Sequence, residues 1–219
     1  MIQSVLRRLD NLVRPELARL RTGKRRLEIV HPDEASEKAR IEANNPLIRY
    51  AKSITSQAGE DGVIAHVLGR LGIAKGWCVE FGAWDGEFNA NTWDLVHNQE
   101  WKAVYIEANQ TAFAKLIRNT ATLPAVYCIN EYIEIDGSWS LDALLSRTPL
   151  PKLFDLLVID IDSNDWHIWK SLKDYQPKVV MIEFSEFCPP EIFYVKDPAA
   201  PGPSSASLSA VCDLGKEKG

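Results

Sequence analysis

Short apolar runs alternate with longer amphipathic segments over most of the chain. Five runs rich in β-branched and aromatic residues have the length of strands, at 77–81, 103–106, 125–129, 154–161 and 178–184. The segments between them are long enough for crossover helices, at 92–101, 111–120, 141–146 and 165–172. Nearly continuous apolar strands that alternate with helices are typical of a parallel sheet covered on both faces. We therefore predict an α/β fold with a doubly wound parallel sheet in the order 3-2-1-4-5.

Helical patterns flank this predicted sheet. A stripe of apolar positions from Val63 to Leu71 indicates a helix that Gly72 closes. After the last strand, the tract 189–207 is rich in Pro and Ser, which predicts a lid or a linker, and 205–218 predicts a helix. The sequence then divides into an extension, residues 1–50, and a core, residues 51–219.

The first 27 residues form a basic head with a helical pattern. Apolar residues recur there at steps of three and four, and Pro15 interrupts them, so we expect a kink or two short helices. Three interpretations stay open: a helix that packs on the core or on a second copy, a basic amphipathic helix on an anionic membrane, and a partly disordered tail. A second charged, helix-prone segment follows at 34–43.

Charge is distributed unevenly along the chain. The head carries eight basic and two acidic residues, a net charge of +6, whereas the remaining 17 Lys and Arg and 28 Asp and Glu leave −11. An acidic body has few groups to contact phosphates, so we expect no nucleic-acid partner. No run approaches the roughly 18 to 20 apolar residues of a membrane span, and the start does not have the pattern of a signal peptide. These features predict a cytoplasmic protein whose contact with a membrane, if it makes one, is peripheral and uses residues 1–27.

Composition excludes several other classes. Apolar residues make up 46% and charged residues 25% of the 219, which is typical of a globular domain and not of a disordered or collagen-like chain. The four cysteines form no CxxC pair, so we expect reduced thiols without a zinc site.

The first predicted strand ends in a glycine-containing loop, 79–86. In a doubly wound sheet, the turn after this strand is the usual cradle for a ligand, and Gly82 and Gly86 permit a tight turn and a close approach. The second strand ends at Glu107, 21 residues after Gly86. A carboxylate at that place accepts hydrogen bonds from the hydroxyls of an adenosine ribose. Both NAD and S-adenosylmethionine contain such a ribose.

The chemistry of this loop distinguishes the two ligands. A dinucleotide loop offers bare backbone N–H groups to a pyrophosphate, but this loop carries Glu80, Asp85 and Glu87 and lacks a third glycine. Carboxylates repel a pyrophosphate and attract the ammonium and sulfonium groups of S-adenosylmethionine. The sequence therefore favours the methyl donor over a nicotinamide dinucleotide.

The stretch from Ser56 to Ser185 resembles the FkbM-type S-adenosylmethionine-dependent methyltransferases. The resemblance depends on 56–61 (SQAGED), 79–86, 106–109 (IEAN) and 160–162 (DID). It implies an O-methyltransferase of a small molecule such as a saccharide. The implied donor contacts are Glu80, Gly82, Asp85, Gly86 and Glu107, with Gln57 and Glu60 in the same pocket. A complete core of this class has two more strands after the helix at 205–218. We expect either a shortened version or a five-strand sheet with an open edge.

The acceptor is expected at the ends of the fourth and fifth strands. Asp160 and Asp162 share a face at the end of one strand, beside the donor loop, and Glu183 ends the next. Transfer to a hydroxyl needs a general base or a cation that lowers the hydroxyl's pKa. His167, Asp162 and Glu183 are the candidate bases. Alternatively, Asp160, Asp162, Asp165 and Glu183 supply oxygen ligands for Mg²⁺, although the composition of a metal site stays open.

Structural interpretations compete with these functional ones. Asp165 also suits an N-cap, His167 a surface position, and the tryptophans at 84, 93, 166 and 169 either core packing or the wall of an acceptor pocket. The alternative function is a catalytically silent binding module with the S-adenosylmethionine fold, which docks to a membrane or partner complex through its basic head.

Overall fold

The computed structural model describes Ala43, residues 45–200 and residues 205–219. The chain divides into two compact units, residues 1–51 and 52–219. The described part of the first unit contains a short 3₁₀ helix, η1 (Ile48–Tyr50). The helices predicted at 1–27 and, except for Ala43, at 34–43 lie outside the described residues. The fold below is that of the second unit.

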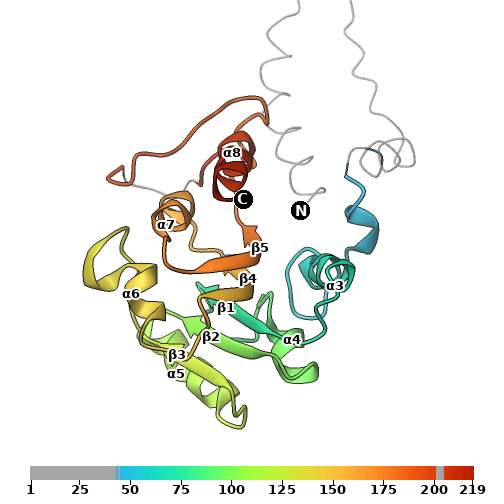
Figure 1. Cartoon of the computed structure of the whole chain (residues 1–219), viewed down its shortest axis with the longest axis vertical. Helices are drawn as coiled ribbons and strands as arrows, with labels where there is room; N and C mark the ends of the chain where they lie inside the picture. Colours follow the sequence, from blue (N-terminus) through green and yellow to red (C-terminus); the bar gives the residue numbers. More distant parts are fainter. Residues whose placement is uncertain (1–42, 44, 201–204) are drawn as a thin grey trace, which may run out of the picture. The chain divides into compact units, whose positions relative to one another are not determined.

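Five parallel strands form one sheet, as Figure 1 shows. They are β1 (Trp77–Phe81), β2 (Lys102–Ile106), β3 (Val126–Ile129), β4 (Leu153–Ile159) and β5 (Gln176–Ile182), in the order β3-β2-β1-β4-β5. The predicted fold class and strand order are confirmed. The fourth and fifth strands end two residues earlier than predicted. After β4, the backbone N–H of Ile161 donates to the Asp165 carboxylate, 2.9 Å away, so the chain turns out of the sheet there.

Helices cover both faces of the sheet. They are α3 (Glu60–Arg70), α4 (Trp93–Asn98), α5 (Gln110–Thr120), α6 (Leu141–Leu145), α7 (Asp165–Ser171) and α8 (Leu208–Lys218). Because side chains alternate along a strand, Val79 and Phe81 of β1 face the core under α6, α7 and α8. Cys78 faces the opposite core, to which α3, α4 and α5 contribute Ile64, Leu95 and Leu116. Each fully buried Val, Leu, Ile or Phe side chain stabilises the fold by about 1.5–3 kcal/mol.

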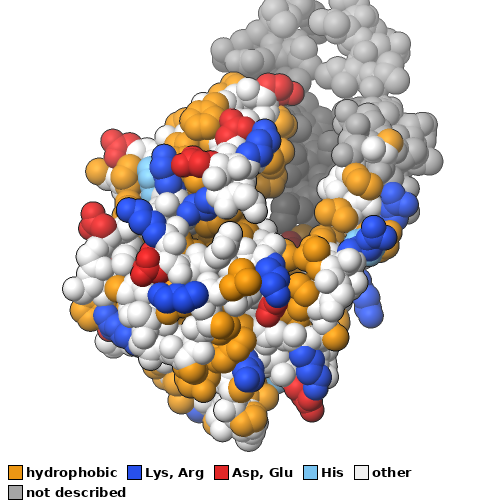
Figure 2. Space-filling model, viewed as in Figure 1, with side chains coloured by type: hydrophobic (Ala, Val, Ile, Leu, Met, Phe, Trp, Pro, Cys, Tyr) orange, Lys and Arg blue, Asp and Glu red, His pale blue; other side chains and the backbone are white. Residues whose placement is uncertain are grey.

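Polar caps fix where several helices begin. The Asn109 side chain accepts the N–H groups of Thr111 and Ala112 at the start of α5. Ser140 and Ser207 cap α6 and α8 in the same way. None of the described helices has both the length and the apolar composition that crossing a bilayer requires. On the face shown in Figure 2, acidic and basic side chains are interspersed with apolar ones.

The strand β5 forms one edge of the sheet within the described residues, since it pairs only with β4. The chain from 183 to 200 then runs without helix or strand before α8, as the Pro- and Ser-rich composition of 189–207 predicts. The predicted helix at 205–218 is present as α8.

Candidate functional site

A cavity of about 300 Å³ opens at the carboxyl ends of the strands. It lies where the winding reverses between β1 and β4, the place where doubly wound sheets bind ligands. The residues that line it come from the ends of β1, β2 and β4 and from the loop after β3. They are Gly82, Trp84, Ile106, Glu107, Ala108, Glu131, Tyr132, Ile133, Asp160, Ile161, Asp162 and Ser163.

Gly82 lets the turn after β1 pass close to the end of β4. Its φ is +79°, and a Cβ atom there would lie 2.0 Å from the carbonyl oxygen of Asp160. Any other residue would therefore strain the backbone and push the two strand ends apart. The close approach forms one wall of the cavity.

Glu107 is held in the cavity by backbone amides from two turns. One carboxylate oxygen accepts the N–H of Trp84 at 2.8 Å, and the other accepts the N–H of Asn109 at 2.6 Å. A carboxylate has about four acceptor sites, so two remain for ligand hydroxyls. The predicted position of Glu107 at the cavity is therefore present in the structure.

Glu80 is predicted to contact the donor, but in the structure it points away from the cavity into the helical layer. It is 3% exposed and does not line the cavity. Its carboxylate accepts the N–H of Asn91 at 2.9 Å and the hydroxyl of Thr92, which lies 3.0 Å from the Tyr105 hydroxyl. Burial raises the pKa of Glu80, and Asp160 adds to the effect. Glu80 thus fixes the start of α4 from inside the helical layer.

Asp85 and Gly86 also support the turn without lining the cavity. Asp85 accepts the N–H groups of Glu87 and Phe88 at 3.2 and 2.8 Å. Gly86 has φ +76°, and a Cβ atom there would lie 2.6 Å from Cδ1 of Leu116 on α5. Both residues shape the loop that carries Trp84.

Three carboxylates meet at one edge of the cavity: Asp160 and Asp162 line it, and Glu183, which does not, lies next to them. Asp160, Asp162 and Glu183 each offer an oxygen within 4.8 Å of the others, and we call them the acidic trio. The register explains the meeting: Ile159 pairs with Ile182, so the next residue of each chain segment is Asp160 and Glu183. The sequence correctly predicted that these side chains come together.

The three side chains of the acidic trio are exposed, and partial burial of the carboxyl groups together with crowding changes the acidity of two of them. Burial, followed by the charges of Asp162, Asp165 and Glu60, raises the pKa of Asp160 to about 6. Burial also raises the pKa of Glu183 to about 7; a hydrogen bond from Ser205 opposes this, and the neighbouring carboxylates add to it. A carboxylate with a pKa near neutrality can accept a proton at physiological pH and release it again.

Asp165 is separate from the acidic trio. It is fully buried, and its oxygens accept the N–H groups of Ile161 and Ser163, each at 2.9 Å. Asn164 is the N-cap residue of α7 and Asp165 the first residue of the helix, so the predicted N-cap is one residue off. Asp165 clamps the loop that presents Asp162, whose φ is +59°.

His167 and Gln57 do not line the cavity. The Nε2 atom of His167 lies 2.7 Å from the carbonyl oxygen of Lys196, which occupies this ring nitrogen. Gln57 is exposed in a segment whose backbone is held by Asp61, which accepts the N–H groups of Ile54, Thr55 and Ser56. The geometry gives neither side chain a contact with the cavity.

The cavity wall that follows β3 was not predicted from the sequence. Glu131, Tyr132 and Ile133 line the cavity, and Asn130 donates to the carbonyl oxygen of Glu107 at 2.7 Å. The signal was available, because the carboxyl end of every strand in a parallel sheet meets the same edge.

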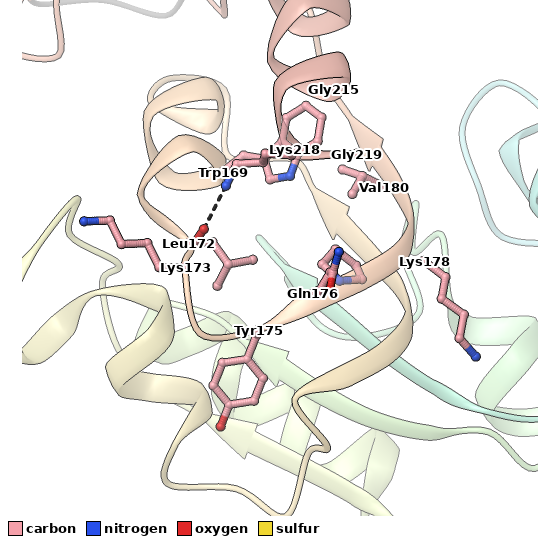
Figure 3. Close-up of a pocket in the computed structure, with 11 residues that line it drawn as sticks. Trp169, Leu172, Lys173, Tyr175, Gln176, Lys178, Val180, Gly215, Lys218 and Gly219 are labelled. Atoms are coloured by element: carbon pink, nitrogen blue, oxygen red, sulfur yellow. Dashed lines mark hydrogen bonds between the residues drawn. The ribbon is translucent and has the colours of Figure 1, made fainter.

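A second cavity, of about 520 Å³, lies between α7, α8 and the amino-terminal half of β5. Figure 3 shows Trp169 and Tyr175 among the side chains around it, with Lys218 donating to the carbonyl oxygen of Leu172 at 2.7 Å. No acidic side chain among the described residues lines this cavity, and it lies at the end of the sheet away from the acidic trio. The smaller cavity is therefore the candidate functional site.

Comparison of the sequence with protein-family models and with curated proteins gives no match. Solved structures do match. The N-terminal domain of EvdMO1 with S-adenosylhomocysteine (SAH) bound has a TM-score of 0.51 at 10% identity, over 86% of this chain and 87% of that one. The same domain in the presence of SAH and D-fucose scores 0.49 at 10% identity, with the same coverage. The SAH-bound methyltransferase PaMTH1 from Podospora anserina scores 0.38 at 14% identity, over 66% and 65% of the two chains.

At such low identities, the likeness shows the fold. It agrees with the five-strand parallel sheet and its flanking helices. Residues 52–219 therefore have the Rossmann-like fold of the S-adenosylmethionine-dependent methyltransferases.

Proposed function

We propose that the chain is an S-adenosylmethionine-dependent methyltransferase of the FkbM type that methylates a hydroxyl group of a small molecule. The observation that carries the proposal is the negative charge of the cavity between the ends of β1 and β4. Glu107, Glu131, Asp160 and Asp162 line it, and no lysine or arginine among the described residues does. Such a site attracts a ligand with ammonium and sulfonium groups.

The residues present fit the donor. Glu107 has two acceptor sites free for the ribose hydroxyls, and Gly82 leaves the wall beside Asp160 without a side chain. We assign Asp160, which lines the cavity, to accept a hydrogen bond from the donor's ammonium group. When bound, the donor supplies an electrophilic methyl group on a sulfonium.

The acidic trio receives the acceptor. We assign proton removal to Glu183, because its raised pKa, about 7, lets it exist as a base at neutral pH and hold a proton afterwards. With donor and acceptor bound, Glu183 would take the proton of the hydroxyl whose oxygen receives the methyl group, and the donor would leave as SAH. Asp162 orients the hydroxyl, and holding it in line supplies much of the rate.

Mg²⁺ at the acidic trio is the alternative to a carboxylate base. Three carboxylates suit a hard cation, which would lower the pKa of the acceptor hydroxyl. The acidic trio would then ligate the ion instead of taking the proton. Whether turnover depends on Mg²⁺ distinguishes the two mechanisms.

Calorimetric titration of the full chain with SAH, with and without Mg²⁺, tests the proposal. We expect binding that is weakened in Glu107→Gln, with NAD as a control ligand that does not bind. Absence of SAH binding in both conditions would refute the proposal, as would equal affinity for NAD. Activity with a panel of hydroxylated acceptors, saccharides included, then tests the choice of oxygen.

A further inference from the structure

The chain segment after Glu183 exposes an unusual number of large apolar side chains. Within residues 184–194, which we call the aromatic tract, five of them are between 42% and 80% exposed: Phe184, Phe187, Ile192, Phe193 and Tyr194. Single exposed apolar residues are ordinary on protein surfaces, whereas a group of them marks a binding site. The aromatic tract therefore has the character of a binding surface.

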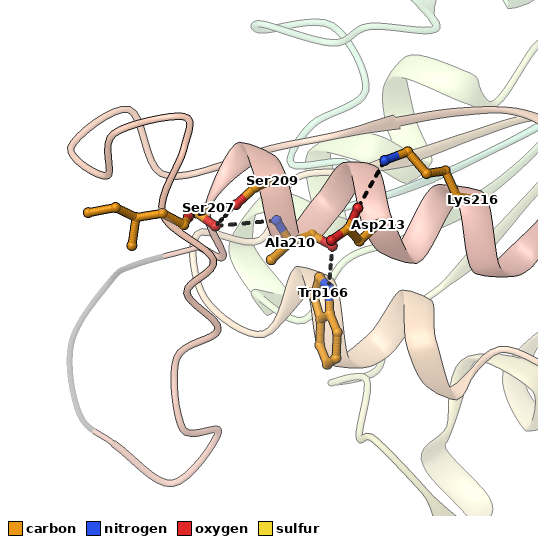
Figure 4. A network of polar contacts seen from close by, with 7 residues as sticks. Trp166, Ser207, Ser209, Ala210, Asp213 and Lys216 are labelled. Atoms are coloured by element: carbon orange, nitrogen blue, oxygen red, sulfur yellow. Dashed lines mark hydrogen bonds and ion pairs between the residues drawn. The ribbon is translucent and has the colours of Figure 1, made fainter.

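Hydrogen bonds fix the backbone near both ends of the aromatic tract. The Ser185 N–H donates to the carbonyl oxygen of Ala206 at 2.8 Å. Tyr194 and Ser207 are bonded in both directions: the Tyr194 N–H donates to the Ser207 hydroxyl, and the Ser207 N–H to the Tyr194 carbonyl, each at 2.9 Å. The Ser207 hydroxyl also caps α8 by accepting the Ala210 N–H, as Figure 4 shows. These bonds fix the backbone while Phe187 and Phe193 remain exposed.

The aromatic tract is continuous with the acidic trio. It begins at the residue after Glu183, and the Ser205 hydroxyl, from the chain segment that returns to α8, donates to the Glu183 carboxylate at 2.9 Å. A molecule that presents a hydroxyl at Glu183 can therefore extend its remaining part along Phe184 and Phe187. The group that reacts and the group that is recognised would then lie side by side.

The charges around this surface restrict the ligand. The aromatic tract contains two acids, Glu186 and Glu191, and no lysine or arginine. The acidic trio adds further carboxylates at one end. A phosphate, a sulfate or an anionic lipid surface would be repelled there, whereas an uncharged amphiphile would not.

We propose that the aromatic tract binds the apolar portion of an uncharged amphiphilic acceptor, taken up as a dispersed molecule, and so directs its hydroxyl to the acidic trio. This inference rests on the proposed methyltransferase function and narrows its acceptor from a polar sugar to a hydroxylated molecule with an acyl, alkyl or aromatic part. Phe187 and Phe193, the two most exposed aromatic residues of the tract, are its specificity-determining residues.

Alkyl glucosides of increasing chain length, below their micellar concentrations, test the inference. Calorimetric titration of the full chain with glucose, hexyl glucoside and octyl glucoside should show affinity that rises by up to about fourfold for each methylene, the most that full burial of a CH₂ allows. The variant Phe187→Ala/Phe193→Ala should lose this dependence on chain length. Leu153→Ala is the matched control, because Leu153 is 58% exposed at the opposite end of the sheet.

Several results would overturn the inference: an affinity independent of chain length, a dependence that persists in the double variant, or octyl sulfate binding as tightly as octyl glucoside. Co-sedimentation with phosphatidylcholine vesicles without binding of dispersed octyl glucoside would also overturn it, since the aromatic tract would then serve a bilayer. SAH is titrated in parallel. If SAH does not bind but the affinity for alkyl glucosides still rises with chain length, the proposed function is refuted, whereas the binding of apolar groups by the aromatic tract is not.

Discussion

Substitution of Gly82 by alanine provides a direct test of how the candidate site is built. The residue has φ +79°, where an L side chain costs about 1–2 kcal/mol. The new Cβ would also lie 2.0 Å from the carbonyl oxygen of Asp160, so the ends of β1 and β4 must separate. Overpacking of this kind adds about 1–3 kcal/mol. We expect Gly82→Ala to lower the free energy of unfolding by about 2–5 kcal/mol and to abolish measurable SAH binding.

Gly72→Ala is the matched control for this test. Gly72 has φ +71°, but no atom lies within 4 Å of a Cβ placed there, so the substitution introduces backbone strain without the clash. Urea unfolding of both variants therefore separates the two contributions, and calorimetry with SAH reports on the site. If Gly82→Ala is no less stable than Gly72→Ala and binds SAH like the unaltered protein, the close approach is not what forms the cavity wall.

Three further predictions concern the carboxylates. Glu107→Gln should weaken SAH binding about 10- to 100-fold, because charge-assisted hydrogen bonds to the ribose are lost; calorimetry measures this. Thr92→Val should lower the free energy of unfolding by about 1–3 kcal/mol, since the buried carboxylate of Glu80 loses a donor; urea unfolding measures this, and SAH affinity should change little. The raised pKa of Glu183 means that the folded state binds more protons than the unfolded state between pH 4.5 and about 7. Stability should therefore fall as pH rises through that window. Asp160, whose pKa is raised to about 6, contributes in the same sense, so Glu183→Gln should reduce the slope of the melting temperature against pH without removing it.

Each of these predictions has a contradicting result. Unchanged SAH affinity in Glu107→Gln would remove that side chain from the ribose contact. Loss of SAH affinity in Thr92→Val at unchanged stability would mean that Glu80 reaches the ligand. Melting temperatures that rise with pH from 4.5 to 7 and are unaffected by Glu183→Gln would show that burial does not disfavour the charge of this carboxylate.

The strands could be predicted from the sequence because their composition and length are local properties. The positions of Gly82 and Glu107 followed from topology alone, since the carboxyl ends of parallel strands share one edge. The meeting of Asp160, Asp162 and Glu183 followed for the same reason.

The direction of individual side chains was harder to predict. Alternation along β1 places Glu80 on the same face as the buried Cys78, inside a helical layer, and this parity was visible in the sequence. The contact of His167 with the carbonyl oxygen of Lys196 joins residues 29 positions apart, and Lys196 lies in the stretch 183–200, which has no helix or strand. No periodicity predicts such a contact, so the sequence left His167 among the candidate bases.

The carboxylates that hold the turns also limit which ligands this site can be adapted to bind. Five amides at the ends of β1 and β4 already donate to protein side chains: Trp84 to Glu107, Glu87 and Phe88 to Asp85, and Ile161 and Ser163 to Asp165. Pyrophosphate sites depend on free amides at such turns. Removing the acids at the cavity surface would free only the Trp84 amide of these five, because Asp85 and Asp165 do not line the cavity, so it would not convert the site to dinucleotide binding. The discrimination is built into the scaffold of the turns, and a change of cofactor would require the loops themselves to be replaced.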